Sequence, residues 1–166
     1  MDSQNTTSTS PNSRYGMVHF ILSHSYIMFL AAVVLGLICD VFLRIKIFNS
    51  HIYEYVGTIM IIAGSLLIYW AQSTSSATRK KTLTKAVEPT DFEDGPYRYS
   101  RNPTHIGLTI MTLGLAFVLN SVSSMIFIII ASLVTKFIFL QKEEALLEQR
   151  YGKPYADYKK KVSTWV

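Results

Sequence analysis

Residues 105–140 read HIGLTIMTLGLAFVLNSVSSMIFIIIASLVTKFIFL, an apolar stretch with a single lysine and, near its middle, the polar pair Asn120-Ser121. A helix rises about 1.5 Å per residue, so roughly 20 apolar residues cross the ~30 Å hydrocarbon core of a bilayer. Asn and Ser favour turns, so this pair divides the stretch into two helices. We expect a transmembrane helical hairpin formed by residues 105–119 and 122–140, of which the first helix is short.

Two further apolar segments precede this hairpin, at residues 26–43 and 52–71. The whole chain is 49% hydrophobic and 16% charged, a low charged share against about 25% in soluble domains. The sequence therefore predicts an all-α integral membrane protein with about four transmembrane helices and a single domain over residues 21–166. The polar residues 1–20 are expected to form a disordered tail.

Basic residues gather in two segments, the loop 72–104 and the C-terminal helix region 141–166. Together these segments contain twelve of the sixteen lysines and arginines. By the positive-inside rule both face the cytoplasm, and with four spans the N-terminus does as well. Because these residues flank apolar segments, the net charge of +5 favours membrane lipids, and not nucleic acid, as a partner. No cluster of residues in the sequence predicts a metal site.

The loop that enters the hairpin reads GPYRYSRNPTHIG over residues 95–107. Its Gly-Pro pair enforces a turn, and its second proline stands where a helix begins. A helix N-terminus presents free backbone N–H groups beside Arg98 and Arg101, an arrangement that suits a carboxylate or a phosphate. Asn102 and His105 then lie about one turn apart on one side of the helix. We predict that these four side chains converge.

A second polar cluster, QKEEALLEQR, follows the last apolar segment at residues 141–150. Its Glu143 and Glu144 are expected about one turn beyond the membrane face. Taken alone, adjacent glutamates at such a place more often end a solvated helix than bind a ligand. Two neighbouring carboxylates also accept hydrogen bonds from a diol or an ammonium group and offset positive charge. These residues by themselves leave both interpretations open.

Residues 94–165 resemble the C-terminal half of the isoprenylcysteine carboxyl methyltransferase and phospholipid methyltransferase family. That family's pattern is roughly G-x-Y-R-x-x-R-[HN]-P-x-Y-x-G, a transmembrane hairpin, and E-E-x-x-L-x-x-x-[FY]-G-x-x-Y-x-x-Y-x-x-x-V-x-x-W. The chain matches this pattern at Gly95, Tyr97, Arg98, Arg101, Pro103, Gly107, Glu143, Glu144, Leu147, Tyr151, Gly152, Tyr155, Tyr158, Val162 and Trp165. It departs at Asn102, where His is commoner, and at His105, where Tyr is usual.

The resemblance implies S-adenosyl-L-methionine as cofactor, held between the loop, the hairpin and the C-terminal helix. It also implies a lipophilic methyl acceptor that enters from the bilayer, such as a prenylcysteine carboxylate or a phospholipid amine. The residues expected to bind the cofactor are Tyr97, Asn102, Pro103, His105, Gly107, Glu143 and Glu144. The candidate catalytic residues are Arg98, Arg101 and Glu144. Whether His105 acts as a base or only contacts the cofactor stays open.

Two other interpretations are compatible with these motifs. Membrane sterol and enone reductases end in a similar Arg-[His/Asn]-Pro-x-Tyr-x-Gly segment and bind NADPH, but they are generally much longer. The pair Glu143-Glu144 favours methyl transfer over reduction. The third interpretation is a non-enzymatic membrane subunit, in which the glutamates and arginines only form interfacial salt bridges. Binding of a specific cofactor separates the three.

Overall fold

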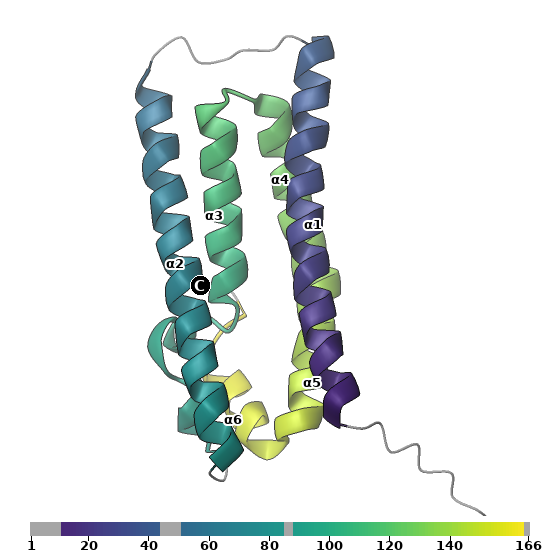
Figure 1. Cartoon of the computed structure of the whole chain (residues 1–166), viewed down its shortest axis with the longest axis vertical. Helices are drawn as coiled ribbons and strands as arrows, with labels where there is room; N and C mark the ends of the chain where they lie inside the picture. The colour runs from purple at the N-terminus through teal and green to yellow at the C-terminus, as the bar shows by residue number, and fades with distance from the viewer. Residues whose placement is uncertain (1–10, 44–50, 85–87, 165–166) are drawn as a thin grey trace, which may run out of the picture.

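The computed structural model describes residues 11–43, 51–84 and 88–164, and in these residues it contains helices and no strands. Four helices run along the long axis (Figure 1): α1 (Pro11–Leu43), α2 (Ile52–Thr84), α3 (Pro103–Val118) and α4 (Val122–Val134). After α4 come the π-helical turn η3 (Thr135–Leu140), α5 (Gln141–Tyr151) and α6 (Lys153–Lys161). Between α2 and α3 lie two short 3-10 helices, η1 (Pro89–Phe92) and η2 (Gly95–Arg98).

Three helical stretches of the described chain are long and apolar enough to cross a membrane: His24–Leu43, Ile52–Thr78 and Val122–Tyr151. The predicted all-helical membrane architecture is thus confirmed. The sequence also predicted a span near α3, but α3 has 16 residues and rises only about 24 Å. It is short because it begins at Pro103 and ends before the turn at Asn120. Three of the four predicted spans therefore meet the length of a bilayer.

Two helices extend beyond their predicted ends. α1 begins at Pro11, so residues 11–20 of the expected N-terminal tail are helical, while residues 1–10 lie outside the described residues. Proline is tolerated in the first turn of a helix, where its missing N–H has no intrahelical partner. α2 continues through residues 72–84 of the expected loop, a polar segment that contains no Gly or Pro to stop a helix.

The predicted turn between α3 and α4 is confirmed at Asn120 and Ser121. Asn120 adopts a φ of 49°, a left-handed conformation that Asn reaches more readily than most residues. Ser121 is the N-cap of α4, and its hydroxyl oxygen accepts a hydrogen bond from the backbone N–H of Ser124 at 3.1 Å. The two helices therefore run antiparallel, joined by a tight connection.

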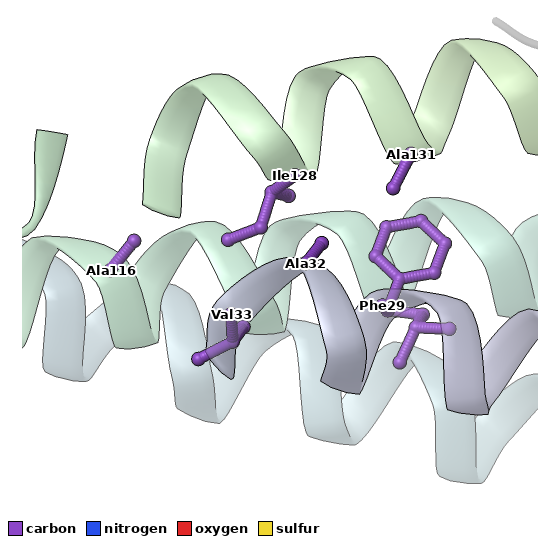
Figure 2. Close-up of a cluster of buried hydrophobic side chains, with 7 residues drawn as sticks. Phe29, Ala32, Val33, Ala116, Ile128 and Ala131 are labelled. Atoms are coloured by element: carbon purple, nitrogen blue, oxygen red, sulfur yellow. The ribbon is translucent and has the colours of Figure 1, made fainter. Parts of the chain in front are cut away.

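The long helices pack as two antiparallel pairs, α1 with α4 and α2 with α3, seen on the right and left of Figure 1. Apolar side chains of α1, α3 and α4, most of them small or branched, form the buried core (Figure 2): Phe29, Ala32, Val33, Leu108, Ala116, Ile128 and Ala131. Large apolar side chains face outward, and Phe42 is 81% exposed while Ile52 is 69% exposed. An apolar exterior around a core rich in small residues suits helices surrounded by lipid.

Glycines allow α2 and α3 to approach closely. A Cβ atom added at Gly64 would lie 2.6 Å from the carbonyl oxygen of Gly107, and one added at Gly107 would lie 2.9 Å from the carbonyl oxygen of Gly64. Gly57 and Gly114 meet in the same reciprocal way, at 2.6 and 2.7 Å. The seven-residue glycine spacing on each helix therefore serves backbone-to-backbone packing.

The short helices gather at one end of the bundle, where α1 also starts and α2 ends (Figure 1). Here an aromatic cluster packs η1 against the C-terminal helices; its members are Phe92, Leu147, Tyr151, Tyr155, Tyr158 and Val162. Gly152 separates α5 from α6 with a φ of 61°, which favours glycine. All predicted site residues lie at this polar end, on η2, in the segment 99–102 that follows it, in the first turns of α3, or on α5.

Candidate active site

The first turn of α3 carries three of the predicted site residues. Asn102 is the N-cap and Pro103 occupies the first helical position, which confirms the helix start expected from the sequence. The side chains of Asn102, Pro103 and His105 are all buried. The polar groups of this turn are therefore withdrawn from solvent.

A buried ion pair joins the segment just before α3 to α5. Arg101 Nη1 lies 3.0 Å from Glu144 Oε2, and the two side chains are 9% and 11% exposed. The Thr164 hydroxyl bridges the pair, because Arg101 Nη2 donates to Thr164 Oγ1, which in turn donates to Glu144 Oε1 at 3.2 Å. Lys159 Nζ lies 3.6 Å from Glu144 Oε2. Both oxygens of Glu144 are therefore engaged by groups of the protein itself.

The neighbouring Glu143 has a different environment. Its Oε2 atom is buried and has no hydrogen-bond partner in the described part of the chain. The same holds, within those residues, for Nδ2 of Asn102 and Nε2 of His105. Arg101 Nε is a further buried atom without a hydrogen-bond partner among the described residues. Buried polar atoms are nearly always hydrogen-bonded in folded proteins, so a group of unpartnered atoms on neighbouring elements indicates a place for a polar ligand.

The pKa of Tyr97 depends on side chains of both α3 and α5. Burial raises the pKa of its phenol, hydrogen bonds with the Thr104 and Ser75 side chains lower it, and the negative charge of Glu143 raises it further. The net direction is upward, so Tyr97 keeps its proton at neutral pH and remains a hydrogen-bond donor. Tyr97 therefore lies near the first turn of α3, through Thr104, and within electrostatic range of Glu143.

The structure separates three other predicted residues from this group. Arg98 is exposed and forms no ion pair with any residue that the structure describes, whereas Arg101, Asn102 and His105 each have buried polar atoms. Gly107 packs against Ile68 and Gly64 of α2, which gives it a role in helix packing. Pro103 starts the helix and offers no hydrogen-bond donor.

Three residues that the sequence did not single out complete the cluster. Ser100 Oγ donates to the backbone oxygen of Thr164 at 3.0 Å, and Thr164 and Lys159 hold Glu144. Nothing in the local pattern marks these common polar residues, and more than sixty positions separate Ser100 from Thr164. Only the fold brings them together.

A hollow on the surface of α2 is a weaker candidate for the ligand-binding site. It is open and mostly apolar, and it is lined by Ala63, Leu66, Leu67, Tyr69, Trp70 and Ser73. None of the predicted site residues lies there. A ligand with several polar groups needs convergent polar partners, and these occur at the turn of α3. Among the described residues, no three His, Cys, Asp or Glu side chains gather as metal ligands would.

Comparison with known families matches most of the chain, including both ends of the bundle. The chain matches the family described as phospholipid methyltransferase over residues 52–154, which is more than half of its length. The matched region begins with α2, ends within α6, and includes every predicted site residue. No curated protein and no solved structure matches the chain.

Proposed function

Because the chain belongs to the phospholipid methyltransferase family, a family of membrane methyltransferases, we propose that it transfers a methyl group from S-adenosylmethionine to a lipophilic acceptor held in the bilayer. The observation that carries the proposal is the set of buried, unpartnered atoms Asn102 Nδ2, His105 Nε2 and Glu143 Oε2. They combine a donor, a group that donates or accepts, and an anionic acceptor.

This donor set fits the cofactor. S-adenosylmethionine carries an ammonium, a ribose diol and a sulfonium cation, and a carboxylate such as Glu143 accepts from the first two and offsets the charge of the third. Its carboxylate and adenine call for donors, which Asn102, the Tyr97 phenol and the free N–H groups at the start of α3 offer. The residues at this end therefore match the cofactor in charge and in hydrogen bonding.

The cofactor supplies an electrophilic methyl group that is already activated, so the protein mainly contributes positioning. The Arg101–Glu144 pair ties α5 to α3 and thereby fixes Glu143 relative to Asn102 and His105. A carboxylate acceptor requires no general base. An amine acceptor must lose a proton, and His105 Nε2 or Glu143 Oε2 is the candidate to take it.

The acceptor that we propose is a prenylcysteine carboxylate or a phospholipid amine that enters from the lipid side. Exposed apolar side chains surround the helices up to the polar end, so a lipid chain can lie against the protein while its head group reaches the α3 turn. We further propose that residues 21–166 act as one domain, with α3 as a short fourth crossing and with both termini in the cytoplasm.

Cofactor binding by the purified protein in detergent tests this proposal. Isothermal titration with S-adenosylhomocysteine should show a 1:1 complex, and NADPH should show no binding. A transfer assay with radiolabelled S-adenosylmethionine and a membrane lipid extract should then label a lipid.

A matched pair of variants locates the site. His105→Phe removes the buried Nε2 but keeps a ring, and it should weaken S-adenosylhomocysteine binding roughly tenfold. His51→Phe makes the same change at an exposed histidine beside Glu54, at the other end of α2, and should leave binding unchanged. Binding of NADPH in place of S-adenosylhomocysteine, or of neither compound, would refute the proposed activity.

A further inference from the structure

Two residues near the C-terminus, Ser163 and Thr164, lie against the loop that precedes α3; we refer to them as the C-terminal strap. The backbone N–H of Arg101 donates to the carbonyl oxygen of Ser163 at 3.0 Å. Ser100 Oγ donates to the carbonyl oxygen of Thr164, also at 3.0 Å. These bonds use backbone groups of the strap, so they set its position almost independently of its side chains.

The strap delivers one hydroxyl to the buried ion pair. Thr164 Oγ1 accepts from Arg101 Nη2 and donates to Glu144 Oε1. Since one hydroxyl serves as acceptor for the cation and donor to the anion, it fixes the relative orientation of two side chains from different elements. The geometry of the pair thus depends on a residue outside both α3 and α5.

The strap itself is held by α6. Val162, directly before it, is buried in the aromatic cluster, and Tyr158 OH donates to the carbonyl oxygen of Tyr97 at 2.7 Å. Burial raises the pKa of Tyr158, so its phenol keeps the proton that this bond requires. The position of Thr164 is therefore determined by packing and hydrogen bonds that do not involve the ion pair.

We infer that Thr164 is a positioning residue of the proposed methyltransferase site. Its hydroxyl bridges Arg101 and Glu144 by two hydrogen bonds. These bonds keep Glu143 and the first turn of α3 in the arrangement that the cofactor requires. The inference rests on the proposed function, and it adds a role for a residue outside the region matched to the family. Thr164 acts through Glu144 and Arg101, not by contact with the cofactor.

Substitutions of Thr164 in the full-length protein test this inference. Thr164→Val keeps the shape of the side chain and the backbone bond from Ser100 but removes the hydroxyl. We expect the Kd for S-adenosylhomocysteine to rise about tenfold, as for loss of hydrogen bonds to charged groups. The KM for the cofactor should rise in parallel, while the KM for the acceptor should stay unchanged. Thr164→Ser restores the hydroxyl and should return both constants to within about twofold of wild type.

Thr90→Val is the matched control, because it makes the same change at an exposed threonine of η1. Size-exclusion chromatography and circular dichroism verify folding of each variant, and Thr164→Ala replaces Thr164→Val if the latter misfolds. Unchanged cofactor affinity in the hydroxyl-free variant would overturn the positioning role while leaving the proposed function intact. Failure of the serine variant to restore affinity would also overturn it. Failure of wild-type protein to bind S-adenosylhomocysteine would instead overturn the proposed function, and the inference with it.

Discussion

Replacing the two adjacent glutamates by glutamine, one at a time, should affect different properties: Glu144→Gln mainly lowers stability, and Glu143→Gln mainly weakens cofactor binding. Glu144 is held by Arg101, Thr164 and Lys159. Glu143 has a buried, unpartnered oxygen and no cation within ion-pair distance among the described residues. The local sequence predicts the same environment for both carboxylates, but in the structure their partners differ.

The expected magnitude for Glu144→Gln follows from its buried pair. Removal of one partner from a buried ion pair costs about 3–5 kcal/mol, because the other charge is left uncompensated. Glutamine keeps one side-chain oxygen that can accept a hydrogen bond, so the lower end applies. We expect the free energy of unfolding to fall by about 3 kcal/mol. Cofactor affinity, measured where the variant is folded, should change less than in Glu143→Gln.

Glu143→Gln should not destabilise the fold. Neutralising a buried carboxylate that lacks a counter-charge removes a desolvation cost, so the free energy of unfolding should stay constant or rise. The cofactor loses a charge-assisted acceptor, which costs about 1.5–3 kcal/mol and weakens binding roughly 10- to 150-fold.

Two measurements on each variant separate these effects. Thermal unfolding in detergent followed by circular dichroism reports stability, and titration with S-adenosylhomocysteine reports affinity. Glu148→Gln is the control on the same helix, because Glu148 is about half exposed and should change the free energy of unfolding by no more than about 0.5 kcal/mol. The reasoning is refuted if Glu143→Gln destabilises the fold as much as Glu144→Gln, or if Glu143→Gln binds the cofactor like wild type.

Three further predictions concern the arginines, the helix packing and the topology. Arg98→Lys should keep full methyl transfer. Arg101→Lys loses the planar fork that contacts both Glu144 and Thr164, so it should lower the rate of methyl transfer at least tenfold. Equal rates in the two variants would contradict this prediction. Gly64→Ala should lower the free energy of unfolding by about 1–3 kcal/mol, since α2 and α3 must separate; an unchanged melting temperature would exclude this close contact. Cysteines placed at positions 80 and 160 should resist an impermeant thiol reagent in intact cells and react after lysis, and labelling of either in intact cells would disprove a shared cytoplasmic side.

Several features of the site could be predicted from local sequence. Proline has a fixed φ and no N–H, so a proline directly before an apolar run predicts a helix start, as Pro103 does for α3. The Asn120-Ser121 turn was predictable for a similar reason, because two small polar residues interrupt a long apolar stretch. The α-helical extension of residues 72–84 was missed, because polar composition alone does not distinguish a solvated helix from a loop.

The different roles of the two glutamates could not be predicted in this way. Adjacent residues on a helix point about 100° apart, and the face that each one meets depends on how α5 packs. The partners of Glu144 come from positions 101, 159 and 164, which approach it only after α6 folds back onto the α3 loop. The sequence also predicted Arg98 as a site residue, because Arg98 lies close to Arg101 in the chain. Chain proximity does not reveal that the Arg98 side chain faces solvent.

The sequence by itself determined that the chain is a helical membrane protein, because long apolar segments must satisfy their backbone hydrogen bonds internally in a bilayer. It also determined the family motifs and the end of the bundle to which they belong, since these depend on local residue types and on chain order. The tertiary structure decided which charges neutralise one another and which stay available. That outcome depends on distances between residues far apart in the chain, and burial makes each such distance energetically decisive.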